Sequence, residues 1–375
     1  MKRDTAIDNL RSAVTVAVVA HHAALAYTTF SRYDPAHYTK STHPVVDAAR
    51  FPPLDVLVGW NDLFFMALMF LISGLFVGPS IGRKGPGRFL ADRAKRLGIP
   101  FLFAAAVLGP LASYPSWLLS DAAGQGGFLA RFFTVDEGSA GPAWFIWVLL
   151  AFSAVAALAC AAWPGAMKRL SWQPRSAWPM AGVFLAVSVA TIIPPYLTMP
   201  GEWLRVAGPV SLPAWRWPLY LAWFTLGIAL GNPGPGRSLA PHNLGPWPLW
   251  LALGALAYLA HATLATGAHT AGTPAWAATV LLSAAFACCC TFTSLGAVGL
   301  ARSWLHAGHP LTASLSANAY GVYLFHYAFV TWAQFGLLPL AAPAAAKFLA
   351  TFLAALAGSW LLTALLRRTA AARVL

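Results

Sequence analysis

The sequence predicts an all-α integral membrane protein, a polytopic bundle of about ten transmembrane helices with both termini in the cytoplasm. Of its 375 residues, 59% are hydrophobic and only 9% are charged, and the mean hydropathy is +0.64. Soluble domains carry about 25% charged residues, so the composition excludes that class. The 17 Trp and 10 Tyr suit the aromatic belts found at membrane interfaces.

The apolar residues gather into stretches long enough to cross a bilayer. The expected spans are 10–30, 57–79, 98–119, 143–163, 179–198, 216–231, 247–267, 274–299, 316–338 and 344–366. The fifth span is expected to be broken at Pro194-Pro195, because proline removes a helix hydrogen bond. No alternating pattern typical of a membrane β-barrel accompanies these spans.

Orientation follows from the positive charges, which favour cytoplasmic segments. With the N-terminus in the cytoplasm, 17 of the 24 Lys and Arg residues fall on that side, including Lys2, Arg3 and the segment 83–96. Topology therefore explains the net charge of +13, and no nucleic-acid partner is expected. Because charged residues interrupt the first apolar run, we interpret it as an uncleaved span rather than a signal peptide.

The first span carries the most informative side chains. Arg11 and His22 are 11 positions apart, which leaves a rotation of about 20° and a rise of about 16 Å along a helix. They therefore face one interior, Arg11 at the cytoplasmic surface and His22 near the midplane. His21 points about 100° away and is interpreted as structural. Asp8 is expected to form an i, i+3 pair with Arg11 at the helix start.

The segment 83–96, expected to be a loop, brings Arg93 and Arg96 to the same face as Arg11. Arginine binds phosphate through two parallel hydrogen bonds, so a phosphate-bearing substrate fits this cluster. The alternatives are that the arginines only set topology and that His22 is a hydrogen-bonded core residue. Asp62 has two interpretations of equal weight, stabilising an imidazolium or pairing with a Lys or Arg.

The ninth span places Tyr320, Tyr323 and His326 at three-residue spacing on a broad helix face. They are candidates to line a cavity, and the alternative is that they pack the bundle. Interfacial anchoring explains Trp144 equally well. The four Cys lie in apolar spans without metal-ligand spacing, so they are interpreted as packing residues and no metal site is predicted.

Taken in order, these residues resemble the acyltransferase-3 family of integral membrane acyltransferases. IDNLRSAVTVAVVAHH is similar to the family's opening, in which Arg, ten residues and then His follow an Asp. The pattern selects Asp8, Arg11 and His22, not His21. LMFLISGLF is similar to the family's Ser-Gly segment, at Ser73.

Three later elements carry the rest of the resemblance. They are RFLADRAKRLGIP with Arg88, Arg93, Arg96 and Pro100, AWFIWVLL with Trp144 and Phe145, and SANAYGVYLFHYAFV with Tyr320, Tyr323 and His326. There are two departures. Ala319 stands where Ser often precedes the late Tyr, and Asp62 lies farther upstream of Ser-Gly than the family's Asp.

The resemblance implies a single transmembrane acyltransferase domain over 6–368, a short basic cytoplasmic tail over 369–375, and no fused esterase-like domain. It implies multi-pass location in a bacterial-type inner membrane and transfer of an acyl group, acetyl or succinyl, from cytoplasmic acyl-CoA to a hydroxyl of a glycan or glycolipid. Acyl-CoA is then a donor substrate, and no cofactor is expected. The oligomeric state stays open.

The implied roles are specific. Arg11, Arg93 and Arg96 would bind the donor phosphates. His22 would act as general base on the acceptor hydroxyl, or would receive the acyl group. The residues expected in the cavity or on the acceptor side are Ser73, Trp144, Tyr320, Tyr323 and His326. The competing class is a transporter or flippase without covalent chemistry, since broken helices and buried charges suit that class too. A third class is a purely structural membrane subunit.

Overall fold

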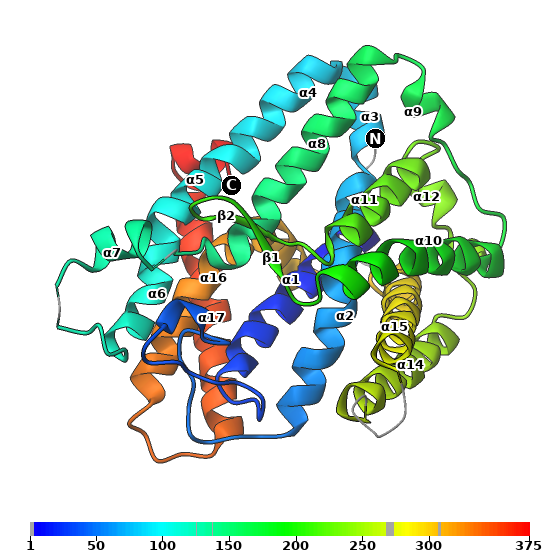
Figure 1. Ribbon diagram of the computed structural model, residues 1–375. Helices are drawn as coiled ribbons and strands as arrows, with labels where there is room; N and C mark the ends of the chain where they lie inside the picture. The colour runs from blue at the N-terminus through cyan, green and yellow to red at the C-terminus, as the bar shows by residue number, and fades with distance from the viewer. Residues whose placement is uncertain (1–3, 125, 137, 268–273, 307–308) are drawn as a thin grey trace.

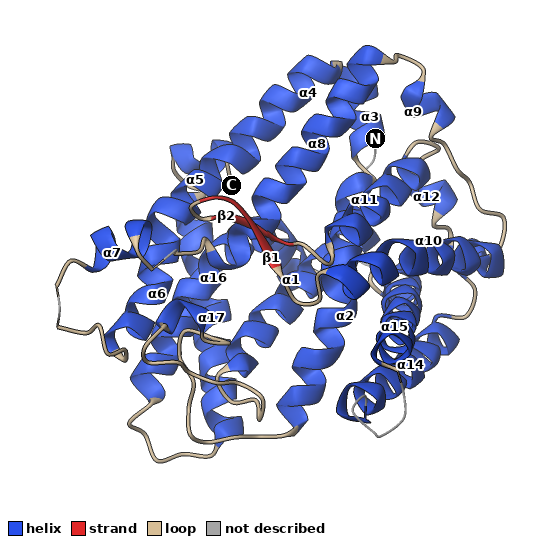
Figure 2. Cartoon of the chain, in the orientation of Figure 1, coloured by secondary structure: helices blue, strands red, loops and turns tan. Residues whose placement is uncertain are grey.

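The computed structural model describes residues 4–124, 126–136, 138–267, 274–306 and 309–375, and most of these are helical (Figures 1 and 2). Lys2 and Arg3, which the predicted orientation counts, lie outside them. The longer helices are α1 (Thr5–Leu25), α2 (Pro53–Gly74), α8 (Trp144–Ala162), α10 (Ala177–Thr198), α11 (Trp217–Gly231), α14 (Trp247–Gly267), α15 (Ala275–Trp304), α16 (Pro310–Leu337) and α17 (Ala344–Leu366).

The remaining elements are short. The α-helical ones are α3 (Val77–Lys84), α4 (Pro86–Arg93), α5 (Ile99–Phe103), α6 (Gly109–Leu118), α7 (Phe128–Thr134), α9 (Ala166–Arg169), α12 (Pro235–Ser238) and α13 (Pro241–Leu244). Single turns of 3₁₀ or π-helix are η1 (Tyr38–Lys40), η2 (Ala94–Gly98), η3 (Ala104–Leu108), η4 (Gly141–Ala143) and η5 (Ala370–Arg373). The strands are β1 (Trp203–Ala207) and β2 (Val210–Pro213).

Seven helical segments of the described chain are long and apolar enough to cross a membrane. They confirm the helical membrane class and coincide with seven of the expected spans. The other expected spans, 10–30, 216–231 and 316–338, correspond to α1, α11 and α16, of which α11 is a shorter apolar helix. A total of ten transmembrane helices stays a prediction.

The less apolar helix α1 lies inside the bundle, where it packs against α2, α15, α16 and α17 (Figure 1). This position explains how a membrane helix can carry Asp8, Arg11 and two histidines, because its neighbours separate it from lipid. Its start and the end of the chain lie at one end of the molecule, since Arg11 and Leu375 line the same cavity.

The basic segment 83–96 is helical, so the predicted loop is wrong. Gly85, with φ of 77°, separates α3 from α4, and Pro86 then begins α4, a position where its missing N–H costs nothing. Lys84 pairs with Asp92 across this turn. Buried Phe89 anchors α4 against the core, which the charge pattern concealed.

Two π-helical turns interrupt the long helical segment that follows. Each of them, η2 and η3, ends two residues before a proline, Pro100 and Pro110 respectively. Proline lacks an N–H and its ring clashes with the carbonyl four residues earlier, so a wider turn lets the helix pass it without breaking. Arg96 lies within the first of these turns.

One further prediction needs correction. The helix α10 runs through Pro194 and Pro195 to Thr198, so the expected break is absent. The structure also adds an antiparallel hairpin of β1 and β2, in which Trp203 pairs with Pro213, to a bundle that agrees with the predicted all-α class. The indole N–H of Trp147 donates to the Ser211 carbonyl at 2.9 Å and fixes the hairpin to α8.

Close packing of α2 on α11 sets the position of one cavity wall. A Cβ atom at Gly74 would lie 2.2 Å from the Phe224 carbonyl oxygen, and one at Gly227 would lie 2.2 Å from that of Leu71. Only glycine permits the two backbones to approach this closely, as in other membrane helix pairs. The neighbouring Ser73 is therefore held in a fixed position.

Candidate active site

Among the cavities of the described chain that border α1, three contain the predicted site residues. The first, of about 290 Å³, lies beside Arg11 and Thr15 near the start of the helix. Two others, of about 350 and 280 Å³, share His22 near its end. We call them the arginine cavity, the loop cavity (for segment 38–44 in its wall) and the tryptophan cavity (for Trp144, Trp203 and Trp215). The arginine cavity is called inner and the other two outer, after the orientation that the sequence predicts.

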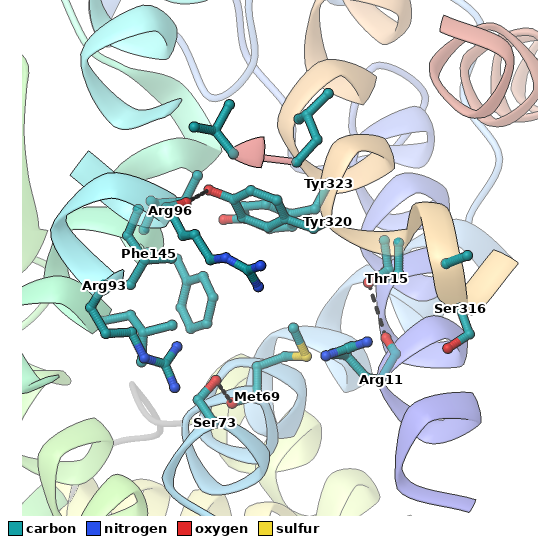
Figure 3. A pocket seen from close by; sticks show the side chains of 17 residues that line it. Arg11, Thr15, Met69, Ser73, Arg93, Arg96, Phe145, Ser316, Tyr320 and Tyr323 are labelled. Atoms are coloured by element: carbon teal, nitrogen blue, oxygen red, sulfur yellow. Dashed lines mark hydrogen bonds between the residues drawn. The ribbon is translucent and has the colours of Figure 1, made fainter. Parts of the chain in front are cut away.

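The arginine cavity gathers residues from six parts of the chain. Arg11 and Arg96 reach toward its centre from opposite sides, and Arg93 borders it (Figure 3). Ser73 and Tyr320 complete the wall, the serine hydroxyl donating to the Met69 carbonyl at 2.8 Å. The structure thus brings together the three arginines that the sequence assigns to the donor.

The charge of this cavity is available to an anion. Arg11 lies 3.5 Å from Asp8, and Arg93 covers the Phe89 ring at 5.3 Å. No Asp or Glu side chain is among the described residues that line the cavity. The Tyr320 hydroxyl donates to the Arg96 carbonyl at 2.8 Å, which fixes the backbone of the π turn. Three guanidinium groups in this setting can bind phosphate oxygens through paired hydrogen bonds.

A further pocket, of about 500 Å³, adjoins the arginine cavity, since Arg93 and Arg96 line both. We call it the basic pocket. Lys95 and Arg373 add positive charge to its wall, where Lys84 is paired with Asp92. The two spaces together offer one continuous basic path toward the interior.

His22 and His326 form a pair at the inner edge of the outer cavities. His326 Nε2 lies 3.2 Å from His22 Nδ1, which also lies 2.9 Å from the Val18 carbonyl. His326 Nδ1 lies 2.7 Å from the Tyr323 carbonyl. His326 is fully buried, whereas His22 lines both outer cavities.

These contacts assign the protons of the neutral pair. A carbonyl can only accept, so Nδ1 carries the proton in both rings. His22 then donates to Val18 and to the bare Nε2 of His326. The remaining nitrogen, Nε2 of His22, has a free electron pair. This is the protonation state that a general base requires.

The loop cavity is built mainly from segments without helical periodicity. His43 is buried there and donates from Nε2 to the Gln334 side-chain oxygen at 2.7 Å. Burial lowers the pKa of His43 to about 4, so the ring is neutral at pH 7. Gln334 in turn donates to the His22 carbonyl at 3.2 Å. A buried ion pair of Asp47 and Lys347 at 2.7 Å ties the same outer segment to α17.

The tryptophan cavity contains the partner of Asp62. Arg216 Nη2 donates to the Asp62 carboxylate at 2.6 Å, so the second interpretation of Asp62, pairing with an arginine, describes the contact. Sequence reasoning missed Arg216, although a charge at the outer end of an apolar span was a usable signal. His21 is buried at this cavity as well, beside the Phe65 ring.

Tyr323 divides the inner and outer spaces. Its side chain lines both the arginine cavity and the tryptophan cavity. Its hydroxyl donates to the Pro142 carbonyl, and Pro142 lines both outer cavities. Trp144 also lies on the outer side. Within the described residues, no group of three or more His, Cys, Asp or Glu is placed to hold a metal ion.

These features define a multi-pass membrane protein with a basic cavity on one side of a histidine pair and mixed polar and aromatic cavities on the other. The family described as an acyltransferase domain matches residues 4–364. The chain therefore belongs to the acyltransferase-3 family and is an acyltransferase. Comparisons with curated proteins and with solved structures gave no match.

Proposed function

We propose that this acyltransferase moves an acetyl or succinyl group from cytoplasmic acyl-CoA to a hydroxyl of a glycan or glycolipid on the far side of a bacterial inner membrane. The observation that supports this most directly is the arrangement along α1. One helix presents Arg11 to a basic cavity and His22 to two outer cavities. The orientation rests on the distribution of Lys and Arg, and the domain is taken as 6–368 with the tail 369–375.

The residues of the inner spaces support a path for the donor. The phosphates of CoA would bind to Arg93 and Arg96, where the basic pocket meets the arginine cavity, with Arg11 deeper inside. The neutral arm of CoA would then extend along the less polar wall formed by Phe145 and Leu149. Its thioester would end at Tyr323, and the acyl group has to pass this side chain to reach His22.

The chemistry assigned to His22 is general base catalysis. Nε2 takes the proton from the acceptor hydroxyl while the hydroxyl oxygen bonds to the thioester carbonyl carbon. The tetrahedral adduct then collapses, the C–S bond breaks, and the CoA sulfur leaves with the proton that Nε2 holds. His326 and the Val18 carbonyl position the ring. In the other route, Nε2 attacks the thioester carbonyl, the C–S bond breaks and CoA leaves as the thiolate. The acceptor hydroxyl then takes the acyl group from Nε2, and its proton goes to the thiolate.

The testing experiment measures thiol release from acetyl-CoA and from succinyl-CoA by purified, reconstituted protein supplied with a native membrane glycan extract. His22→Ala is compared with His242→Ala, a histidine that is exposed and outside the cavities. We expect release to be lost in the first variant and kept in the second.

Equal release in both variants would remove His22 from the mechanism. No release by the wild-type protein, together with movement of intact glycan across the vesicle membrane, would favour the transporter. Rapid denaturation at neutral pH during turnover of acyl-labelled CoA distinguishes the two routes, because only the second leaves labelled acyl group on the protein.

A further inference from the structure

The tryptophan cavity contains buried polar atoms that no protein group satisfies. His21 and Arg216 are only 8% and 7% exposed. Among the described residues, neither His21 Nδ1 nor Arg216 Nε has a hydrogen-bond partner, and both residues line the cavity. Buried polar groups are normally paired, so the wall of this cavity keeps unused hydrogen-bonding capacity that a polar ligand would complement.

The charge in this cavity is balanced within the wall. Asp62 neutralises Arg216, whose guanidinium is held over the Trp215 ring at 3.8 Å and also donates to the Asp62 carbonyl at 3.0 Å. The Asp62 side chain remains 44% exposed, and the residue lines the cavity. A ligand therefore meets a paired carboxylate and guanidinium, which suits neutral hydroxyl groups better than an anion.

Aromatic rings form much of the remaining wall. Trp144 lies edge-on to Trp203, with centroids 5.9 Å apart, and nearly parallel to Tyr220 at 5.8 Å. Aromatic faces carry negative potential, which attracts the weakly positive C–H bonds on the flat face of a sugar ring. Aromatic faces beside hydroxyl-binding polar groups are the combination that recognises a pyranose.

We propose that the tryptophan cavity is the subsite that binds one hexopyranose ring of the acceptor. The proposal rests on the proposed function in one respect, that the acceptor is a glycan. At about 280 Å³ the cavity lies just below the roughly 300–1,000 Å³ of drug-sized pockets, so it holds one ring. Since His22 lines the same cavity, a hydroxyl of that ring lies beside the base.

The hairpin supplies the outer side of this subsite. Trp203 begins β1, Pro213 ends β2, and Trp215 follows directly. Trp203 is 50% exposed, so its ring contributes to the cavity without being part of the core. It is therefore the residue of choice for a test that leaves the fold intact.

The test is saturation-transfer NMR of protein in nanodiscs with three probes, methyl β-D-glucopyranoside, methyl α-D-mannopyranoside and methyl β-D-galactopyranoside. We expect transfer to the ring protons of at least one probe with the wild-type protein. Trp203→Ala is expected to reduce it about fivefold, and Asp62→Asn and His21→Ala to reduce it as well. Trp276→Ala is the matched control, since Trp276 is 67% exposed and lines none of these cavities.

The outcomes separate this subsite from the proposed function, because the NMR assay contains no donor. Absence of transfer to every probe, or equal transfer with Trp203→Ala and wild type, would overturn the subsite, whatever the acyl-CoA assay shows. Selective loss with Trp203→Ala would support it. If that loss were seen in a protein that releases no thiol from acyl-CoA, the sugar subsite would stand and the donor assignment would fall.

Discussion

The arginine cavity and the two outer cavities share α1, yet they are built in different ways. The inner wall comes from helices, with its charges on α1, on α4 and in the π turn η2. The outer walls use helices too, but they add polar and aromatic groups from segment 38–44, from the turn before Pro142 and from segment 203–216, which contains the hairpin. A helix wall is fixed by packing, whereas a loop wall can change its side chains without disturbing the core.

Under the proposed function, the difference suits separate tasks on the two sides. A donor with invariant phosphates needs a rigid array of charges, which helices supply. An acceptor whose structure varies needs an adaptable surface, which loops supply. Substitutions on the inner side should therefore alter donor affinity, and those on the outer side should alter acceptor affinity. Substitution of His22, which lies between the two sides, should alter only the rate of transfer.

The largest effect is expected for His22→Gln, which keeps a polar side chain but removes the base. General base catalysis contributes about 10²- to 10⁴-fold, so kcat should fall by that range while acyl-CoA affinity stays unchanged. Thiol release and equilibrium binding of acyl-CoA measure the two quantities. A matching loss of donor affinity would place His22 in the donor site and break the division.

Arg96→Gln is expected to weaken acyl-CoA binding by about 10- to 100-fold, because a hydrogen bond to a charged group contributes roughly 1.5–3 kcal/mol. Arg96→Lys should be intermediate, since lysine keeps the charge but loses the paired geometry. Arg175→Gln is the control, an exposed arginine outside the described pockets. Equal donor affinity in all variants would contradict the assignment of this cavity.

Gly74→Ala tests whether the inner wall is fixed by packing. Its methyl group would meet the Phe224 carbonyl oxygen at 2.2 Å, so the free energy of unfolding should fall by about 1–3 kcal/mol. Thermal unfolding in detergent measures the change. Gly82→Ala is the matched control, because nothing lies within 4 Å of a Cβ there. A destabilisation of the same size in both variants would show that helix propensity, not packing, is responsible.

The smallest effect is expected for His326→Ala, because the Val18 carbonyl still orients His22. Loss of one neutral hydrogen bond, about 0.5–1.5 kcal/mol, predicts a fall in kcat of about threefold to tenfold with unchanged KM values. The pH profile of kcat should also shift, since the ring beside the base has gone. A drop as large as that of His22→Gln would make His326 a direct participant.

The inner side was largely predictable from the sequence, and the reason is helical periodicity. The 11-residue spacing of Arg11 and His22 fixes their common face, and the resemblance adds Arg93, Arg96 and Ser73. The structure brings Arg11, Arg93 and Arg96 to one cavity. Their roles stay predictions, but their proximity is observed.

The outer side was not predictable in this way. Arg216 lies 154 positions from Asp62, and His43 lies 291 positions from Gln334. Such pairs depend on how loops fold onto the bundle, and no local period encodes them. The sequence left two interpretations of Asp62 for this reason. At Pro194-Pro195 the local rules predicted a helix break that does not occur. The last turn of α10 accommodates both prolines.

Because of the π turn at Ala94–Gly98, the proposed donor site depends on the number of residues in this segment of the chain. A π turn holds one more residue than an α turn, so it shifts the phase of everything beyond it by about 100°. Deleting one of its uncharged residues would rotate Arg93 by about 100° relative to the helix that follows, although no charge would be removed. The number of residues between Arg93 and Pro100 therefore matters as well as their identity. An insertion elsewhere in α5 would not restore the orientation of Arg93.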